Sequence, residues 1–218
     1  MKNLRAPKCK CGKTQNPNGN CDGSHANLRN NTFKTTFGIL VVLLGLFFQS
    51  FTVSDNLKIR KSSIQWKGEK VVGSHMGTIE LKSANLVFDK ERLKGGEFVM
   101  DMTSIVCTDL TGDYKNDLEG HLKSNDFFGV EKFPTSSLQI LKVEEAKKNQ
   151  YKINAKLTIK GITKDIVFVA EQNDNMLNAV INIDRTEFDI RYGSGSFFDS
   201  LGDNMIYDEF EIKVSLEI

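Results

Sequence analysis

Three cysteines and one histidine near the start of this 218-residue chain have the types and spacing that suit a metal centre. Cys9, Cys11 and Cys21 are followed at a spacing of four by His25. Three thiolates and one imidazole can complete the four-coordinate ligation of a transition metal. Residues 1–34 carry too little apolar surface to fold alone, because chains shorter than about 40 residues usually need metals, disulfides or association. We therefore expect a metal centre in this segment.

The same segment contains Cys9-Lys10-Cys11, then Thr14 three residues later, and then Cys21-Asp22-Gly23-Ser24-His25. With these residues it resembles the CDGSH iron-sulfur family. The resemblance implies that Cys9, Cys11, Cys21 and His25 bind a 2Fe-2S cluster, and that two amino-terminal segments pair in a homodimer. The ligand set by itself also permits a Cys3His zinc site, so zinc is the alternative metal.

An uncharged stretch at residues 35–54 follows the cysteine-rich segment. Twenty residues make roughly 30 Å of helix, which matches the hydrocarbon core of a bilayer. The most apolar part, residues 37–48, is shorter, so the hydrophobic region of a cleavable signal peptide is the alternative. The long polar segment before it and the poor cleavage pair formed by Phe48 and Ser50 favour an uncleaved transmembrane helix over residues 35–54.

The distribution of charge predicts the orientation of this helix. Residues 1–34 hold seven Lys or Arg against one acidic residue, whereas residues 55–218 hold 22 basic and 27 acidic residues. Positive segments are retained in the cytoplasm. We therefore expect a single-pass protein of the inner (cytoplasmic) membrane, with residues 1–34 in the cytoplasm and residues 55–218 in the periplasm. The positive charge adjoins a membrane segment, so we expect no nucleic-acid partner.

Alternation of apolar and polar residues predicts that residues 55–218 form antiparallel strands. The period of two is clearest at residues 151–160 and 209–218, and it recurs at 63–67, 78–88, 98–106, 137–143, 166–170 and 179–184. Turn-forming residues at 94–96, 148–150, 160–161 and 173–175 separate these runs. One stretch, residues 114–122, predicts a short helix with Asp113 as its amino-terminal cap. The pattern indicates a mainly β, up-and-down barrel.

Three strings in this part of the chain are distinctive. They are His121-Leu122-Lys123-Ser124-Asn125-Asp126-Phe127-Phe128-Gly129-Val130-Glu131-Lys132-Phe133-Pro134, Leu157-Thr158-Ile159-Lys160-Gly161-Ile162-Thr163-Lys164 and Ile183-Asp184-Arg185-Thr186-Glu187-Phe188. In their order and spacing, residues 61–218 resemble the YceI-like domain family. The resemblance implies an extended eight-stranded antiparallel barrel, lipocalin-like, that holds an isoprenoid or other long-chain amphiphilic lipid outside the cytoplasm.

Five apolar side chains are the candidate lipid contacts. Phe127 and Phe128 could line a barrel mouth, and Trp66, Phe98 and Met100 lie at positions that face a barrel interior. A core anchor is the more usual role for a residue like Trp66, and ordinary core packing explains Phe98 and Met100 equally well. His75, His121 and Cys107 have no apparent partners in sequence, so structural roles are expected for them.

We see no spacing of nucleophile, base and acid that would indicate an enzyme. The expected function is therefore a membrane-anchored extracytoplasmic binding protein for an isoprenoid or other amphiphilic lipid, with a cytosolic 2Fe-2S segment. The alternative is a membrane redox or sensor protein that uses the cluster, with the barrel as an adaptor domain.

Overall fold

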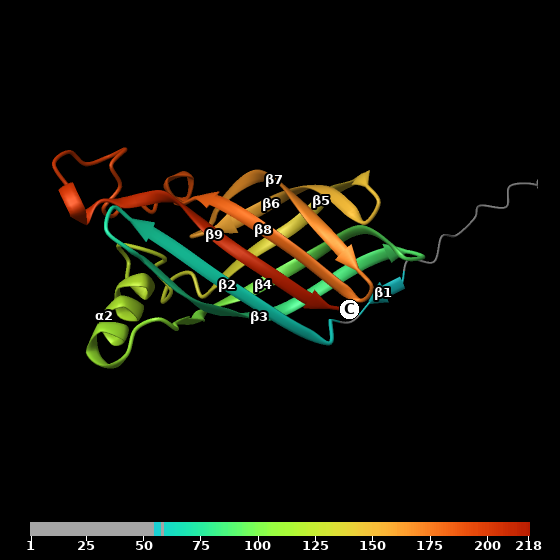
Figure 1. Cartoon of the computed structure of the whole chain (residues 1–218), viewed down its shortest axis with the longest axis horizontal. Coiled ribbons are helices and arrows are strands. Elements are labelled where there is room, and N and C mark those ends of the chain that lie inside the picture. Colours follow the sequence, from blue (N-terminus) through green and yellow to red (C-terminus); the bar gives the residue numbers. More distant parts are fainter. Residues whose placement is uncertain (1–54, 58) are drawn as a thin grey trace, which may run out of the picture. The chain divides into compact units, whose positions relative to one another are not determined.

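The computed structural model describes residues 55–57 and 59–218, and these form a β-barrel with one α-helix (Figure 1). The expected metal segment at residues 1–34 and the expected transmembrane helix at 35–54 lie outside the described residues. The strands are β1 (Asp55–Leu57), β2 (Lys61–Lys70), β3 (Ser74–Asp89), β4 (Arg92–Cys107), β5 (Thr135–Lys147), β6 (Gln150–Ile159), β7 (Ile162–Asn173), β8 (Met176–Asp184) and β9 (Ile206–Glu217). The helices are α2 (Gly112–Lys123) and the short 3-10 turns η2 (Arg185–Phe188) and η3 (Gly202–Asn204).

Strands β2 to β9 close into an eight-stranded barrel in which every pair of neighbours is antiparallel. Each strand pairs with the next one in the chain, and β9 returns to pair with β2. Strand β1 adds three residues alongside the second half of β3. Closure gives every strand from β2 to β9 a paired neighbour on each side. The expected mainly β, eight-stranded antiparallel barrel with one helix is confirmed.

Tight turns connect most of the strands, and one predicted turn is wrong. Lys160 and Gly161 both have positive φ (49° and 75°), which is the geometry of a two-residue hairpin. Residues 94–96, expected to form a loop, instead lie inside β4, and the β3–β4 turn lies at residues 90–91. The glycines at 95 and 96 coincide with a shift of the β3–β4 register, and a Cβ on Gly96 would lie only 2.9 Å from the carbonyl oxygen of Asn85. Glycine within a strand often marks such a bulge or close approach rather than a turn.

Helix α2 begins earlier than the sequence pattern predicts. Its amino-terminal cap is Thr111, whose side chain makes no capping hydrogen bond, and Asp113 lies in the first turn. The proposed cap at Asp113 is therefore wrong. An acidic side chain in the first turn still favours the helix, because it faces the positive end of the helix dipole.

The two ends of the barrel differ in structure. We call the end that carries α2 and the β8–β9 connection the helix end, and the end that carries β1 and the turns at residues 90–91, 148–149 and 174–175 the hairpin end (Figure 1). The hairpin end is filled by a buried apolar cluster that includes Leu86, Phe88 and Leu216, each no more than 1% exposed. A second apolar cluster, which includes Phe127, Phe188 and Ile190, lies toward the helix end.

Strands β7 and β8 are only partly paired in the barrel wall. These strands pair only over residues 170–173 and 176–179. Beyond Ala170 and Ala179, β7 continues to pair with β6 and β8 continues to pair with β9, but the two strands no longer pair with each other. We call this divergence the β7–β8 seam.

Candidate functional site

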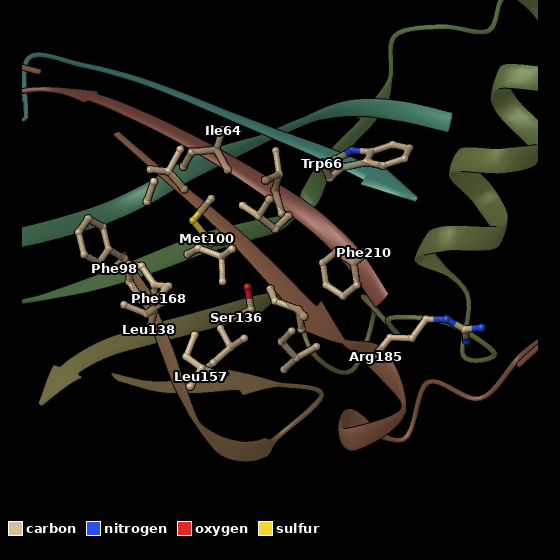
Figure 2. A pocket seen from close by; sticks show the side chains of 18 of the residues that line it. Ile64, Trp66, Phe98, Met100, Ser136, Leu138, Leu157, Phe168, Arg185 and Phe210 are labelled. Atoms are coloured by element: carbon tan, nitrogen blue, oxygen red, sulfur yellow. The ribbon is translucent and has the colours of Figure 1, made fainter. Parts of the chain in front are cut away.

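An apolar cavity of about 200 Å³ lies inside the barrel, and all eight barrel strands contribute side chains to it. Figure 2 shows how the side chains converge on it, from Phe98, Leu138 and Phe168 on one side to Phe210 and Arg185 on the other. The alternating strand pattern explains this lining, since one face of each strand in a closed barrel points inward. The wall is aliphatic and aromatic with few polar groups, so it can bind a hydrocarbon chain.

All five candidate lipid contacts line this cavity. Trp66 comes from β2, Phe98 and Met100 come from β4, and Phe127 and Phe128 come from the connection between α2 and β5. The two phenylalanine rings form an edge-on pair with centroids 5.2 Å apart. Their segment is fixed by backbone hydrogen bonds to the last turn of α2, such as Phe128 N to Leu122 O at 3.1 Å.

A large bulge in β4 brings two further side chains to the cavity. Between the pairs Thr78–Val106 and Glu80–Asp101, four residues of β4 face a single residue of β3. The carboxylate of Asp101 holds the bulge by accepting hydrogen bonds from the backbone and the hydroxyl of Thr103, at 2.9 and 2.6 Å. Met102 and Ile105, which line the cavity, lie within this bulge.

Arg185 lines the helix end of the cavity, and sequence reasoning did not single it out. Arg185 as a whole is 1% exposed. The guanidinium donates to the carbonyl oxygens of Ile190, Ile206 and Tyr207, at 2.8, 3.0 and 3.1 Å. Its carbon also lies 5.7 Å from the centre of the Phe127 ring. In sequence, Arg185 is one charged residue among several between β8 and β9, so only the folded chain identifies it as buried.

Asp208 neutralises part of the Arg185 charge. Its Oδ1 lies 3.5 Å from Arg185 Nη2, and its Oδ2 accepts a hydrogen bond from the Ser196 hydroxyl at 2.5 Å. Burial by itself raises the pKa of Asp208. Hydrogen bonds from the hydroxyls of Ser194 and Ser196, together with the charge of Arg185, outweigh the effect of burial, so the pKa lies below its ordinary value. Burial lowers the pKa of Arg185, and the charges of Asp208 and Asp184 oppose that effect. The ion pair therefore joins the β8–β9 connection to the start of β9.

His121 belongs to the aromatic packing at the helix end. Its ring packs edge-on against Tyr192 at 4.3 Å and against Phe127 at 5.6 Å. This packing connects α2 to the residues beside the cavity. It agrees with the structural role expected from the sequence.

His75 and Cys107 meet at Asp109. Its carboxylate accepts a hydrogen bond from the Cys107 thiol at 3.0 Å and lies 3.1 Å from His75 Nδ1. The cysteine is fully buried, which agrees with the structural role expected for it. Burial, followed by the hydrogen bond to Asp109, raises the pKa of the thiol, which therefore stays protonated and poorly nucleophilic.

The described residues contain no group of three or more His, Cys, Asp or Glu side chains arranged to hold a metal ion. Within residues 55–57 and 59–218, no helix has both the length and the apolar character needed to cross a bilayer. The predicted metal ligands Cys9, Cys11, Cys21 and His25 precede this part of the chain.

Comparison with protein families identifies the barrel. A family profile described as the YceI-like domain matches residues 56–218. The chain belongs to the YceI-like domain family. Among curated proteins, none matches the chain.

Solved structures have the same fold. The YceI-like barrel superimposes on BcnA of Burkholderia cenocepacia with a TM-score of 0.59 and 22% identity, covering 73% of this chain and 98% of that one. A polyisoprenoid binding domain from Saccharophagus degradans, implicated in plant cell wall breakdown, matches with a TM-score of 0.50 and 11% identity, covering 74% and 95%. A YCEI protein of Campylobacter jejuni matches with a TM-score of 0.45 and 21% identity, covering 64% and 81%.

Proposed function

We propose that this protein is a membrane-anchored binding protein for an isoprenoid or other long-chain amphiphilic lipid, held by the YceI-like barrel outside the cytoplasm. The observation that carries the proposal is the apolar cavity enclosed by the barrel. Each methylene group transferred from water to such an interior contributes about 0.8 kcal/mol. A long hydrocarbon chain therefore needs few polar contacts to bind with useful affinity. Binding without turnover is sufficient for this function.

The cavity must widen to accept a long ligand. Its volume of about 200 Å³ is smaller than the roughly 300–1,000 Å³ of pockets that hold drug-sized ligands. Met100 and Met102 line it, and methionine side chains repack more easily than branched or aromatic ones. The β7–β8 seam gives the wall a place where strands can separate further without breaking ladder hydrogen bonds.

The family relationship supports the class of ligand. A domain from Saccharophagus degradans with the same fold is described as polyisoprenoid binding. That similarity and the apolar wall of this chain's own cavity together support an isoprenoid lipid as the ligand.

The amino-terminal segment belongs to the same proposal. Three thiolates and one imidazole at Cys9, Cys11, Cys21 and His25 fit a 2Fe-2S cluster chemically, and such a cluster would supply one-electron redox chemistry on the cytoplasmic side. Residues 35–54 would cross the inner membrane, and the cysteine-rich segments of two chains would pair in a homodimer. Cluster and barrel would then lie on opposite sides of about 30 Å of hydrocarbon.

Native mass spectrometry of the full-length protein, purified anaerobically in mild detergent, tests the proposal. The expected spectrum shows a chain that retains residues 1–54, with the mass of two irons and two sulfides and a releasable long-chain lipid. A chain that begins near residue 55 would contradict the anchor, and bound zinc would contradict the cluster. A barrel that stays empty after incubation with polyprenyl lipids would contradict lipid binding.

A further inference from the structure

Ser136 places a hydroxyl inside a cavity wall that is otherwise almost wholly apolar. It lies on β5 and is 8% exposed. Figure 2 shows its oxygen directed into the cavity, between the labelled side chains of Met100 and Leu157. Its partner across the β4–β5 ladder is Met100, and the next inward-facing residue on β5 is Leu138.

Five other polar residues contribute to the lining. Ser137 lies on the opposite face of β5 from Ser136, and Tyr207 and Glu209 are exposed. Arg185 and Asn178 make contacts of their own. Arg185 lies at the helix end and donates to three backbone carbonyls. The amide oxygen of Asn178 accepts a hydrogen bond from the Ser215 hydroxyl. Ser136 is therefore the polar group in the middle of the cavity that is oriented toward a ligand.

A ligand that fills the cavity removes the Ser136 hydroxyl from whatever water reaches it. A buried hydroxyl without a partner is unfavourable, whereas one that donates to a ligand oxygen recovers the loss. A carbonyl oxygen is the simplest partner, since it only accepts. A ligand hydroxyl would bring its own hydrogen-bond donor, and the surrounding apolar wall offers few acceptors for it.

We propose that Ser136 is a specificity-determining residue that selects a lipid with a carbonyl oxygen within the barrel, over a lipid that is pure hydrocarbon along the same length. This inference rests on the proposed lipid-binding function and adds to it the chemical class of the ligand. Shape and apolar burial provide most of the affinity, and the hydrogen bond from Ser136 sets the position of the ligand along the cavity.

The effect of Ser136→Ala on the binding of two lipids, one with a carbonyl and one without, tests this proposal. Full-length protein in detergent is titrated with geranylgeranylacetone, an isoprenoid with one carbonyl, and with squalene, an isoprenoid hydrocarbon. Emission from Trp66, the sole tryptophan of the chain and a residue of the cavity wall, reports binding. Ser136→Ala is expected to weaken geranylgeranylacetone about tenfold, the loss of one hydrogen bond to a buried group. Squalene should bind Ser136→Ala as well as wild type or severalfold more tightly.

Two further variants complete the test. Ser136→Thr keeps the hydroxyl and should retain preference for the carbonyl lipid, and Ser63→Ala, at an exposed position of β2, should bind both lipids like wild type. Unchanged or tighter binding of geranylgeranylacetone by Ser136→Ala would overturn the role of Ser136 while leaving lipid binding intact. Failure of wild type to bind either lipid would overturn the proposed function and this inference with it.

Discussion

The indole of Trp66 lies directly over Gly77, its cross-strand partner on β3. A Cβ added to Gly77 would lie 2.6 Å from Trp66 Cζ2 and 1.9 Å from the carbonyl oxygen of Val106. The absence of a side chain at residue 77 therefore allows the indole of Trp66 to approach the backbone of β3 closely.

Gly77→Ala should destabilise the barrel and displace Trp66. No rotation relieves a contact between a Cβ and a backbone oxygen, so β3 or β4 must shift, and we expect a loss of about 1–3 kcal/mol or more, as for an overpacked core. Urea unfolding followed by Trp66 emission measures both effects. Gly68→Ala is the control, because a Cβ on Gly68 meets no atom within 4 Å. Equal stability of the two variants would contradict this account.

Arg185→Lys should destabilise the protein by several kcal/mol. The planar guanidinium donates to three carbonyls at once, and an ammonium group cannot reproduce that geometry. Each carbonyl left buried without a partner costs about 1–3 kcal/mol. Chemical denaturation of the variant measures the change in free energy of unfolding. Arg191→Lys, at an exposed arginine of the same connection, should change stability by less than about 0.5 kcal/mol.

The contribution of Asp208 to stability should depend on pH. Its pKa in the folded protein lies below the ordinary value of about 3.9, so the folded state favours the carboxylate more than the unfolded chain does. The contribution is therefore present above about pH 4 and is lost as the pH falls through the lower folded pKa. Thermal unfolding of wild type and Asp208→Asn should differ at pH 7, and the difference should shrink as the pH falls below about 4. A constant difference across that range would count against the ion pair with Arg185.

Amide hydrogen exchange should reveal the β7–β8 seam. Residues 162–169 and 180–184 each pair with one neighbouring strand only, so roughly every second amide points into the seam instead of a ladder. Those amides should exchange faster than the amides of the β5–β6 ladder, which pairs over nearly its whole length. Exchange resolved to single residues by NMR or by fragmentation mass spectrometry measures this pattern. Uniform protection of residues 180–184 would show that the strands close in solution.

The succession of strands was predictable because side chains on a strand alternate between two environments. Every run of alternating residues in the sequence became a strand of the barrel, usually several residues longer than predicted. The errors lie at turns and caps. Gly95 and Gly96 were assigned to a turn but occupy a strand, because glycine is used both where a chain reverses and where two backbones approach closely.

The candidate site was predictable only in its apolar part. Trp66, Phe98, Met100, Phe127 and Phe128 could be chosen because large apolar residues at inward positions must line whatever a closed barrel encloses. Ser136 and Arg185 gave no such signal, since serine and arginine are ordinary residues of exposed strands and loops.

By itself, the sequence determined the succession of strands, the alternation of apolar and polar faces along them, and the family of residues 56–218. These properties follow from local periodicity and from short strings of residues. Only the tertiary structure decided that Arg185 is buried against three carbonyls, that the Ser136 hydroxyl points into the cavity, and that β7 and β8 diverge. Each of these depends on residues far apart in the chain, whose closeness is set by how the barrel closes.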